Sequence, residues 1–382
     1  MARQNGIVSR RVRLDIAADR PADEAIRSRQ EVSVELDDGR RVRLDGADER
    51  SQGRVAVLAG LEKLGRPVYL EVDPETDAVT RLLIPHVARI VSIRQSDAGY
   101  DVALDVSHAR HSLARDNPDF AEFEGLLRDA LARRTPVIVT EDDDHNILDI
   151  RLFTPGPDDP PLPPWPGDDV PPDRRGPRGG LFSGFRRWRI WPWRWRYGCI
   201  SMARAQQVFD AMSATTCDPL TVPAPCIPFL YPDDGCWARA HEMCRLMIAD
   251  FGLSPRKVWI SGNLHTLTRN NPNCFVDWGW HVAPTLCVYR RRPWWLWWWW
   301  WWRGETMVVD PSLFATPVSA ATWKSVQGDP GATLTYTDWT DYLWGATDPT
   351  FAQTNHFLAV YRLQLLNRSN GPAGPPPYAH CP

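Results

Sequence analysis

A run of proline, glycine and charged residues divides the chain into two parts. Residues 154–180 include the sequence PGPDDPPLPPWPGDDVPPDRRGPRGG, which has too few apolar side chains to form a packed core. With 382 residues in the chain, each flanking part is long enough to bury a core of its own. We expect a β-rich domain over 1–153, a linker with an Arg/Trp-rich segment over 154–198, a second domain over 199–368 and a Pro-rich tail over 369–382.

The first part has the pattern of an antiparallel β-rich domain, with a barrel as one arrangement of its strands. Residues 31–44 alternate apolar and polar side chains on both sides of Asp38-Gly39, which predicts a tight hairpin. Further alternating runs occupy 67–72, 79–84, 87–94, 100–106, 137–140 and 147–152. A single helix, starting near Asn117-Pro118, interrupts them.

No constellation in this first part predicts chemistry. Its histidines, at 86, 108, 111 and 145, are scattered along the sequence. The acidic turn 141–146, EDDDHN, lacks the spaced ligands and glycine of a calcium loop, so we interpret it as a solvated loop.

Charge and cysteine usage limit the classes of partner and compartment. The net charge of -3 predicts no general affinity for nucleic acid. The N-terminus lacks the apolar run of a secretory signal, and we expect no transmembrane span; cytoplasmic synthesis is the expectation, with export by a non-classical route as the alternative. All eight cysteines follow residue 198 without a CxxC pair, which excludes a zinc ribbon or thioredoxin motif but leaves disulfides open.

Two runs combine arginine with tryptophan, at Trp188–Trp195 and Trp294–Trp302. Indole rings favour membrane interfaces and arginine favours anionic headgroups, so contact with a membrane or envelope surface is one interpretation. Carbohydrate stacking and cation–π self-association are others, as is a low-complexity expansion at a hairpin tip. The residues do not decide among them.

The segment Ile227–Met247, IPFLYPDDGCWARAHEMCRLM, places Cys236 at the start of a predicted helix. A turn-forming run precedes it, and Ala240, Met243 and Met247 follow at helical spacing until Gly252. Unpaired backbone N–H groups at a helix start favour thiolate, so we expect a lowered pKa for this thiol. Taken alone, the position is also compatible with a buried structural cysteine.

Two later segments supply a base and an orienting acid for such a thiol. The segment 276–289, VDWGWHVAPTLCVY, predicts a long strand that carries His281, and 306–309 predicts the next strand, which ends at Asp310. Thiol catalysis needs an imidazole that exchanges a proton with sulfur and a carboxylate that holds the ring.

Other side chains fit these two roles less well. His241 lies five positions after Cys236, about 140° around a helix, and is interpreted as a helix anchor. His265 is expected in a polar loop without an orienting carboxylate, and His356 at the start of a late strand. Asp277 lies about 13 Å from His281 along the strand.

The ordered segments IPFLYPDDGCWARAH, WGWHVAP and VVDPSL resemble the bacterial protein-glutaminase (protein-glutamine deamidase) family. The resemblance implies an α+β fold, with a papain- and transglutaminase-like core in which the cysteine-bearing helix packs on an antiparallel sheet. It also implies that Cys236, His281 and Asp310 are nucleophile, general base and orienting acid.

The implied reaction is deamidation of protein-bound glutamine through a cysteine acyl-enzyme, with no metal or organic cofactor. The partner is then a protein or peptide with an accessible glutamine. Trp237, Trp278 and Trp280 are candidates to line the substrate cleft, or they pack in the core. Transglutaminase and peptidase activity use the same triad and remain alternatives, as does a membrane- or envelope-binding protein that acts through the two Arg/Trp runs.

Overall fold

The computed structural model describes residues 6–15, 31–45, 48–157, 159, 162–163, 198–289, 304–343 and 345–382. Both Arg/Trp runs, Trp188–Trp195 and Trp294–Trp302, lie outside these residues, as does most of the expected linker. The chain divides into two compact units. Unit 1 comprises 1–163, 217–224 and 359–381, and unit 2 comprises 164–216, 225–358 and residue 382.

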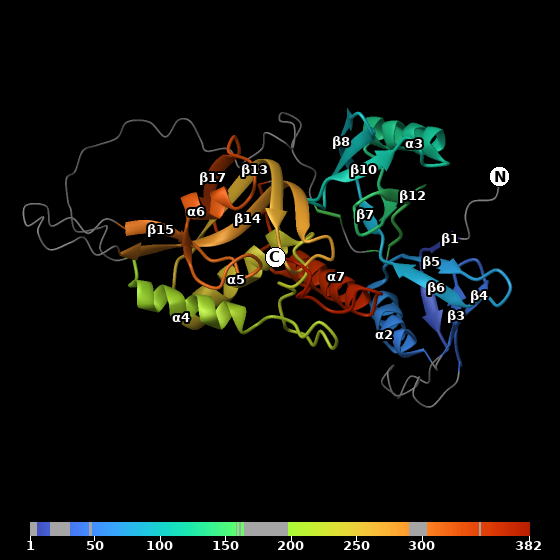
Figure 1. The fold of residues 1–382 in the computed structure, drawn as a ribbon, viewed down its shortest axis with the longest axis horizontal. Coiled ribbons are helices and arrows are strands. Elements are labelled where there is room, and N and C mark those ends of the chain that lie inside the picture. Colours follow the sequence, from blue (N-terminus) through green and yellow to red (C-terminus); the bar gives the residue numbers. More distant parts are fainter. Residues whose placement is uncertain are drawn as a thin grey trace, which may run out of the picture. The chain divides into compact units, whose positions relative to one another are not determined.

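Unit 1 is built from short antiparallel sheets (Figure 1). It contains four three-stranded sheets, with strand orders β1-β5-β6, β2-β3-β4, β10-β9-β8 and β12-β11-β7. The strands are β1 (Gly6–Ser9), β2 (Val12–Leu14), β3 (Glu31–Leu36), β4 (Arg41–Asp45), β5 (Val68–Val72), β6 (Val79–Leu83), β7 (His86–Ala88), β8 (Ile90–Gln95), β9 (Gly99–Leu104), β10 (His111–Ala114), β11 (Val137–Glu141) and β12 (Ile147–Leu152).

The expected hairpin around Gly39 is present, but the barrel is not found among the described residues. Gly39 has a φ of 82°, the left-handed conformation that a tight hairpin turn needs. The expected strand 87–94 is broken at Arg89 into β7 and β8, which belong to different sheets. Short sheets with such breaks do not share one continuous hydrogen-bonded ladder, so they do not close on themselves.

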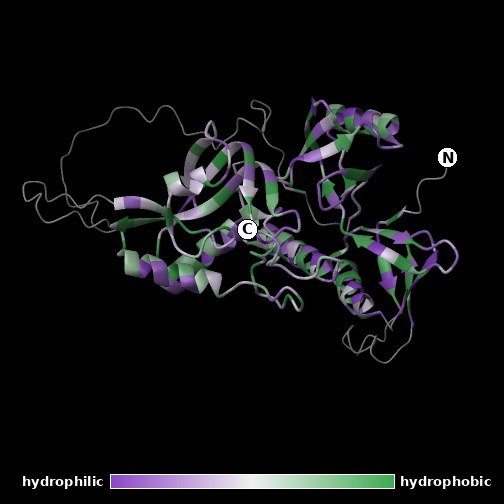
Figure 2. Cartoon of the chain, in the orientation of Figure 1, coloured by the Kyte–Doolittle hydropathy of each residue, from purple (hydrophilic) through white to green (hydrophobic). Residues whose placement is uncertain are grey.

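Unit 1 has a helix that its pattern did not predict. Helix α2 (Glu49–Leu64) is capped by Asp48, whose side chain accepts a hydrogen bond from Arg50 N, and it ends at Gly65 with a φ of 61°. Its apolar residues do not form one stripe, which is why periodicity missed it. The predicted helix is α3 (Phe120–Arg133), whose hydrophilic and hydrophobic residues alternate in Figure 2.

Unit 2 has a mixed α+β fold around one larger antiparallel sheet (Figure 1). The sheet has five strands in the order β16-β15-β14-β13-β17, and helix α5 packs against β14. The elements are α4 (Met202–Ser213), α5 (Cys236–Phe251), β13 (Arg256–Leu267), β14 (Phe275–Tyr289), β15 (Gly304–Val308), β16 (Val318–Ser319), α6 (Ala320–Ser325), β17 (Thr333–Asp338), the β18 (Asp341–Leu343) and β19 (Ala346–Thr347) pair, and α7 (Ala352–Ser369), of which only the residues up to 358 belong to this unit.

Two sequence expectations for this unit were wrong. His265 does not lie in a loop, because β13 continues to Leu267 through a register shift between Ser261 and Leu264. Because of this shift, the polar segment after Ser261 stays paired with β14. Its side chains do not alternate between apolar and polar, so the sequence pattern did not reveal the strand. His356 lies in α7 rather than at the start of a strand.

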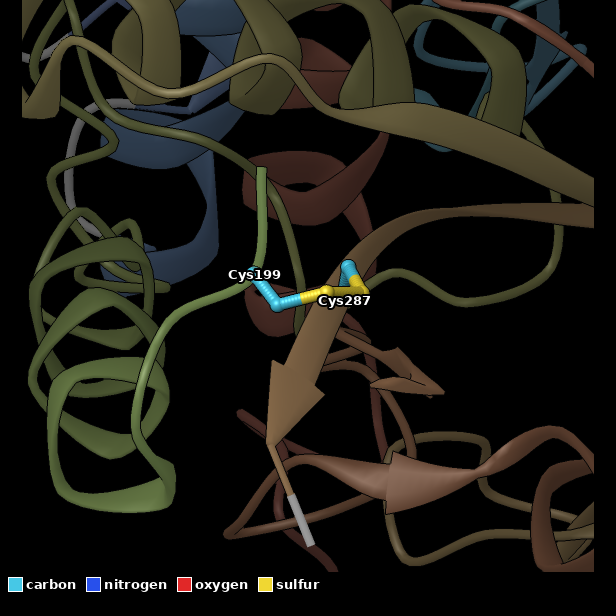
Figure 3. Close-up of a disulfide and its surroundings, with 2 residues drawn as sticks. All are labelled: Cys199 and Cys287. Carbon is cyan, nitrogen blue, oxygen red and sulfur yellow. A yellow bond between two sulfur atoms is a disulfide. The ribbon is translucent and has the colours of Figure 1, made fainter. Parts of the chain in front are cut away.

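A disulfide fastens the segment before α4 to the central sheet (Figure 3). Cys199 is bonded to Cys287 of β14, with a Cα–Cα distance of 4.4 Å. The adjacent Ile200 N–H donates to Cys287 O at 2.9 Å, and Tyr289 N–H donates to Ile200 O at 2.8 Å. Cys217, Cys226, Cys274 and Cys381 are also disulfide-bonded. None of the helices in the described ranges is long and apolar enough to cross a membrane.

A buried lysine joins helix α5 to the sheet. Lys257 of β13 is fully buried, and its Nζ lies 2.9 Å from His241 Nδ1 and donates to Asp341 O at 2.5 Å. His241 also lies against the rings of Tyr342 and Phe351. Burial lowers the pKa of Lys257 to about 8, and burial with the nearby ammonium lowers the pKa of His241 to about 4.

This lysine makes stability depend on pH in the alkaline range. Between about 8 and 10.5 the unfolded chain keeps the Lys257 proton and the folded chain does not, so stability should rise with pH by about 3 kcal/mol. We expect Lys257→Met to flatten this rise in chemical unfolding measured from pH 8 to 10.5. Lys324→Met, on α6, is the control that should keep the wild-type slope. An equal slope in Lys257→Met would contradict the assignment.

Candidate active site

Cys236 is the first residue of α5, as its sequence position predicted. The preceding Gly235 has a φ of 80°, a left-handed conformation that favours glycine and turns the chain into the helix. Arg239, one turn along α5, is buried, and its Nη1 donates to Tyr231 O at 2.9 Å and to Asp234 O. A buried guanidinium therefore holds the turn that sets the position of the thiol.

His281 and Asp310 meet at the centre of the sheet. His281 lies in β14, and Asp310 follows β15, which pairs with β14. His281 Nε2 lies 2.9 Å from Asp310 Oδ2, and both side chains are buried. The carboxylate also accepts from the backbone N–H of Ser312 at 3.2 Å. These contacts fix the plane of the imidazole ring and leave Nδ1 as the ring nitrogen that can exchange a proton with a thiol.

The thiol lies beside this imidazole. The sulfur of Cys236 and a ring nitrogen of His281 are within 4.8 Å of each other. The structure thus brings together the three residues that sequence reasoning singled out, each from a different element of unit 2. A separation of this size allows proton exchange after a small side-chain rotation.

Two tryptophans stack on the ring of His281. Trp278 stacks on it with ring centroids 4.5 Å apart, and Trp323 stacks on it at 5.5 Å. Trp323 Nε1 donates to Asp310 Oδ2 at 2.9 Å. Sequence reasoning missed Trp323, which sits in the short helix α6, and missed Arg239. A lone tryptophan in a six-residue helix carries no signal for such a role.

The three proposed cleft tryptophans are all buried. Trp237 and Trp278 are 0% exposed and Trp280 is 6% exposed. Trp237 contacts the rings of Trp280 and Phe357, and Trp278 Nε1 donates to Asp233 O at 3.2 Å. In this structure they form the packing around the site, and contact between any of them and a substrate stays a prediction.

Burial controls the electrostatics of the site. It raises the pKa of the Cys236 thiol despite the opposing charge of Arg239 and a hydrogen bond from the Val282 backbone. The sequence predicted a lowered pKa for this thiol at the helix start, and that prediction is wrong in direction. The desolvation of the buried sulfur has a larger effect on the pKa than the helix start. Burial also acts to raise the pKa of Asp310, but His281 and the Trp323 N–H overcome it and leave that pKa lowered.

The competing histidines lie apart from this site within unit 2. His241 contacts Lys257 instead of Cys236, as its position around the helix predicted. His265 does have a carboxylate partner, contrary to expectation: its Nδ1 lies 3.0 Å from Asp277 Oδ1, across the β13–β14 pair. The two side chains are 51% and 35% exposed, so we interpret the pair as a surface contact.

Comparison with known proteins gives a family for the part of the chain that carries these residues. Residues 205–327, which include Cys236, His281 and Asp310, match the family model described as "Glutaminase". No curated protein matches the chain.

Solved structures of two forms of protein-glutaminase are similar to the chain. The crystal structure of pro-protein-glutaminase is 20% identical and covers 78% of this chain and 99% of its own, with a TM-score of 0.49. The crystal structure of protein-glutaminase is 26% identical and covers 48% and 98%, with a TM-score of 0.37. The NMR structure of the Chryseobacterium proteolyticum protein is 27% identical and covers 41% and 84%, with a TM-score of 0.35. Over residues 205–327, the part that carries Cys236, His281 and Asp310, the chain is thus similar to the glutaminase family.

Proposed function

We propose that the chain hydrolyses the side-chain amide of protein-bound glutamine to glutamate and ammonia. The observation that supports this most directly is the position of His281, whose Nε2 is held by Asp310 and whose ring lies within 4.8 Å of the Cys236 sulfur. The match of residues 205–327 to the glutaminase family model favours the glutamine carboxamide as the group attacked. The substrate is then a protein or peptide with an accessible glutamine.

The first step is attack by Cys236 on the carboxamide carbon. Because burial raises the pKa of the thiol, the sulfur keeps its proton until His281 accepts it, and Asp310 stabilises the imidazolium that forms. The C=O π electrons move to oxygen as the S–C bond forms. Backbone N–H groups at the start of α5, that of Cys236 included, are donors for the resulting oxyanion.

The second half of the reaction returns the enzyme to its starting state. Imidazolium His281 gives its proton to the leaving nitrogen, so that the C–N bond breaks and ammonia departs, with a γ-glutamyl thioester left on Cys236. His281 then takes a proton from water, the hydroxyl attacks the thioester carbon, and the C–S bond breaks. Imidazolium His281 returns its proton to the departing Cys236 sulfur, which restores the thiol and the neutral imidazole, and the carboxylic acid product ionises to glutamate.

The state of the cysteines favours a location of the active protein outside the reducing cytoplasm. Cys236 and Cys244 are the two free thiols, and the other six of the eight cysteines are disulfide-bonded. Disulfides persist in oxidising compartments. We therefore infer that the protein is exported after cytoplasmic synthesis.

Replacement of the proposed nucleophile tests the reaction. Cys236→Ala should lower ammonia release from a glutamine-containing peptide by at least about 10³-fold, because no other group forms the acyl-enzyme. Cys244→Ala, which removes the other free thiol, eight residues further along α5, should keep the wild-type rate. Unchanged ammonia release by Cys236→Ala would rule the proposal out.

The fate of the acyl group distinguishes glutamine deamidation from the two alternative activities, transglutaminase and peptidase. With a fluorescent primary amine present, we expect the glutamine to become glutamate and the peptide backbone to stay intact, both read by mass spectrometry. Amine incorporation as the main product would assign a transglutaminase, and backbone cleavage would assign a peptidase.

Removal of one hydrogen bond tests the role of Asp310. Trp323→Phe keeps a ring against His281 but removes the N–H donor to Asp310, so the pKa of that carboxyl should rise. Activity needs the carboxylate, and the acid limb of the kcat profile should therefore move to higher pH, with kcat about tenfold lower. Trp259→Phe is the matched control, because it loses an N–H bond to Thr337 on β17. Superimposable acid limbs for Trp323→Phe and wild type would contradict this role.

A further inference from the structure

Three histidines of unit 1 converge on one glutamate, Glu141, at the end of β11. His86 Nε2 lies 3.1 Å from Glu141 Oε1, and His145 Nδ1 lies 2.9 Å from the same oxygen. His111 Nδ1 contacts the other oxygen, Oε2. These histidines are scattered along the sequence, but the fold brings three of the four expected to be isolated, His86, His111 and His145, together.

Strand pairing accounts for the meeting of His86 and Glu141. His86 of β7 is paired with Val139 of β11. Residues two apart on a strand share a face, so Glu141 lies on the same face of the sheet as Val139 and beside His86. The two side chains are therefore held together by backbone hydrogen bonds, independently of any contact between them.

The other two histidines are joined by the turn between β11 and β12. His111 is the first residue of β10, and the next residue, Ser112, donates its N–H to His145 O at 2.9 Å. His145 has a φ of 60°, a left-handed conformation that costs a residue with a side chain roughly 1 kcal/mol. Asp142 Oδ1 accepts from the backbone N–H of Asn146 at 2.9 Å and closes this turn. The hairpin is thus shaped so that His145 points to Glu141.

The four side chains are withdrawn from solvent. The side chain of His111 is 0% exposed, those of His86 and His145 are 9% exposed, and that of Glu141 is 10% exposed. Burial of a carboxylate together with several imidazoles is costly unless their polar atoms are satisfied by strong partners. A cation bound among these side chains is such a partner.

The donor atoms select the class of cation. Imidazole nitrogens with one carboxylate suit zinc and related transition ions, whereas calcium takes six to eight oxygens. The ligand atoms of His111, Glu141 and His145 all lie within 4.8 Å of one another. Zinc with bonds of about 2.0–2.1 Å in a tetrahedron separates its ligands by about 3.3 Å, which this spacing allows after small rotations.

We propose that His111, Glu141 and His145 bind one divalent transition ion of the zinc type, with His86, which lies against Glu141, turning to become the fourth ligand. The ion ties β7 and the β11–β12 hairpin to β10, which belongs to a different three-stranded sheet. Four protein ligands fill a tetrahedral site, so the role is structural. This site lies within unit 1 and is independent of the deamidase proposal.

Metal binding to the full-length chain tests the site. The background is Cys236→Ala, so that the thiol beside His281 does not compete for the ion. After loading with Zn²⁺ and desalting, elemental analysis should find one equivalent per chain, and Co²⁺ should give the visible absorption of a tetrahedral site. His111→Gln and Glu141→Gln should each weaken binding at least about 100-fold. His265→Gln, which removes an exposed histidine of unit 2 that also faces a carboxylate, should bind like the background.

Thermal unfolding supplies a second readout. Removal of zinc with a chelator should lower the Tm of the background protein and leave the Tm of His111→Gln unchanged, because only the former loses a ligand that favours the folded state. No retained zinc and no cobalt absorption in the background protein would overturn the proposal, whatever the stability of the variants. Binding that is equal in the background, His111→Gln and Glu141→Gln would overturn it too, and would leave a histidine–glutamate hydrogen-bond network.

Discussion

The contact between His281 Nε2 and Asp310 Oδ2, 2.9 Å long, is the interaction on which the site depends. It exists because β14 and β15 are paired, so the histidine of one strand and the aspartate that follows the next lie together in the core. Trp278 and Trp323 stack on the ring, and Trp323 also donates to the carboxylate. The imidazole therefore has one plane and one orientation before any substrate binds, which is the preorganisation that proton transfer requires.

Because the Cys236 thiol is buried, the proposed reaction needs the imidazole that Asp310 holds beside it. A thiol at an open helix start can ionise by itself, but burial raises the pKa of Cys236. In the proposed reaction the sulfur therefore becomes a nucleophile only when His281 takes its proton. The surrounding framework holds these groups in place: Arg239 fixes the turn before the thiol, Lys257 joins α5 to the sheet, and the Cys199–Cys287 disulfide secures β14. Each of them stabilises the geometry of the site without itself taking part in the proposed proton transfers.

The sequence was sufficient to predict the position of residues that local patterns place. Cys236 stands after a turn-forming run and before a helical pattern, and His281 and Asp310 stand on successive strand patterns, so their meeting could be predicted. Trp323, Arg239 and the group around Glu141 could not, because their contacts depend on which distant strands pair. The predicted barrel was wrong for the same reason, because alternation of apolar and polar residues identifies strands but not the strands with which they pair. Helix α2 was not predicted because its apolar residues form no single stripe.

Detection of the acyl-enzyme tests the central claim most directly. Wild-type protein mixed with a glutamine peptide and quenched in acid within one turnover should carry the mass of the peptide minus ammonia. Fragmentation should place that adduct on Cys236. An adduct on Cys244, the other free thiol, or ammonia release with no covalent adduct at any time point, would contradict the account.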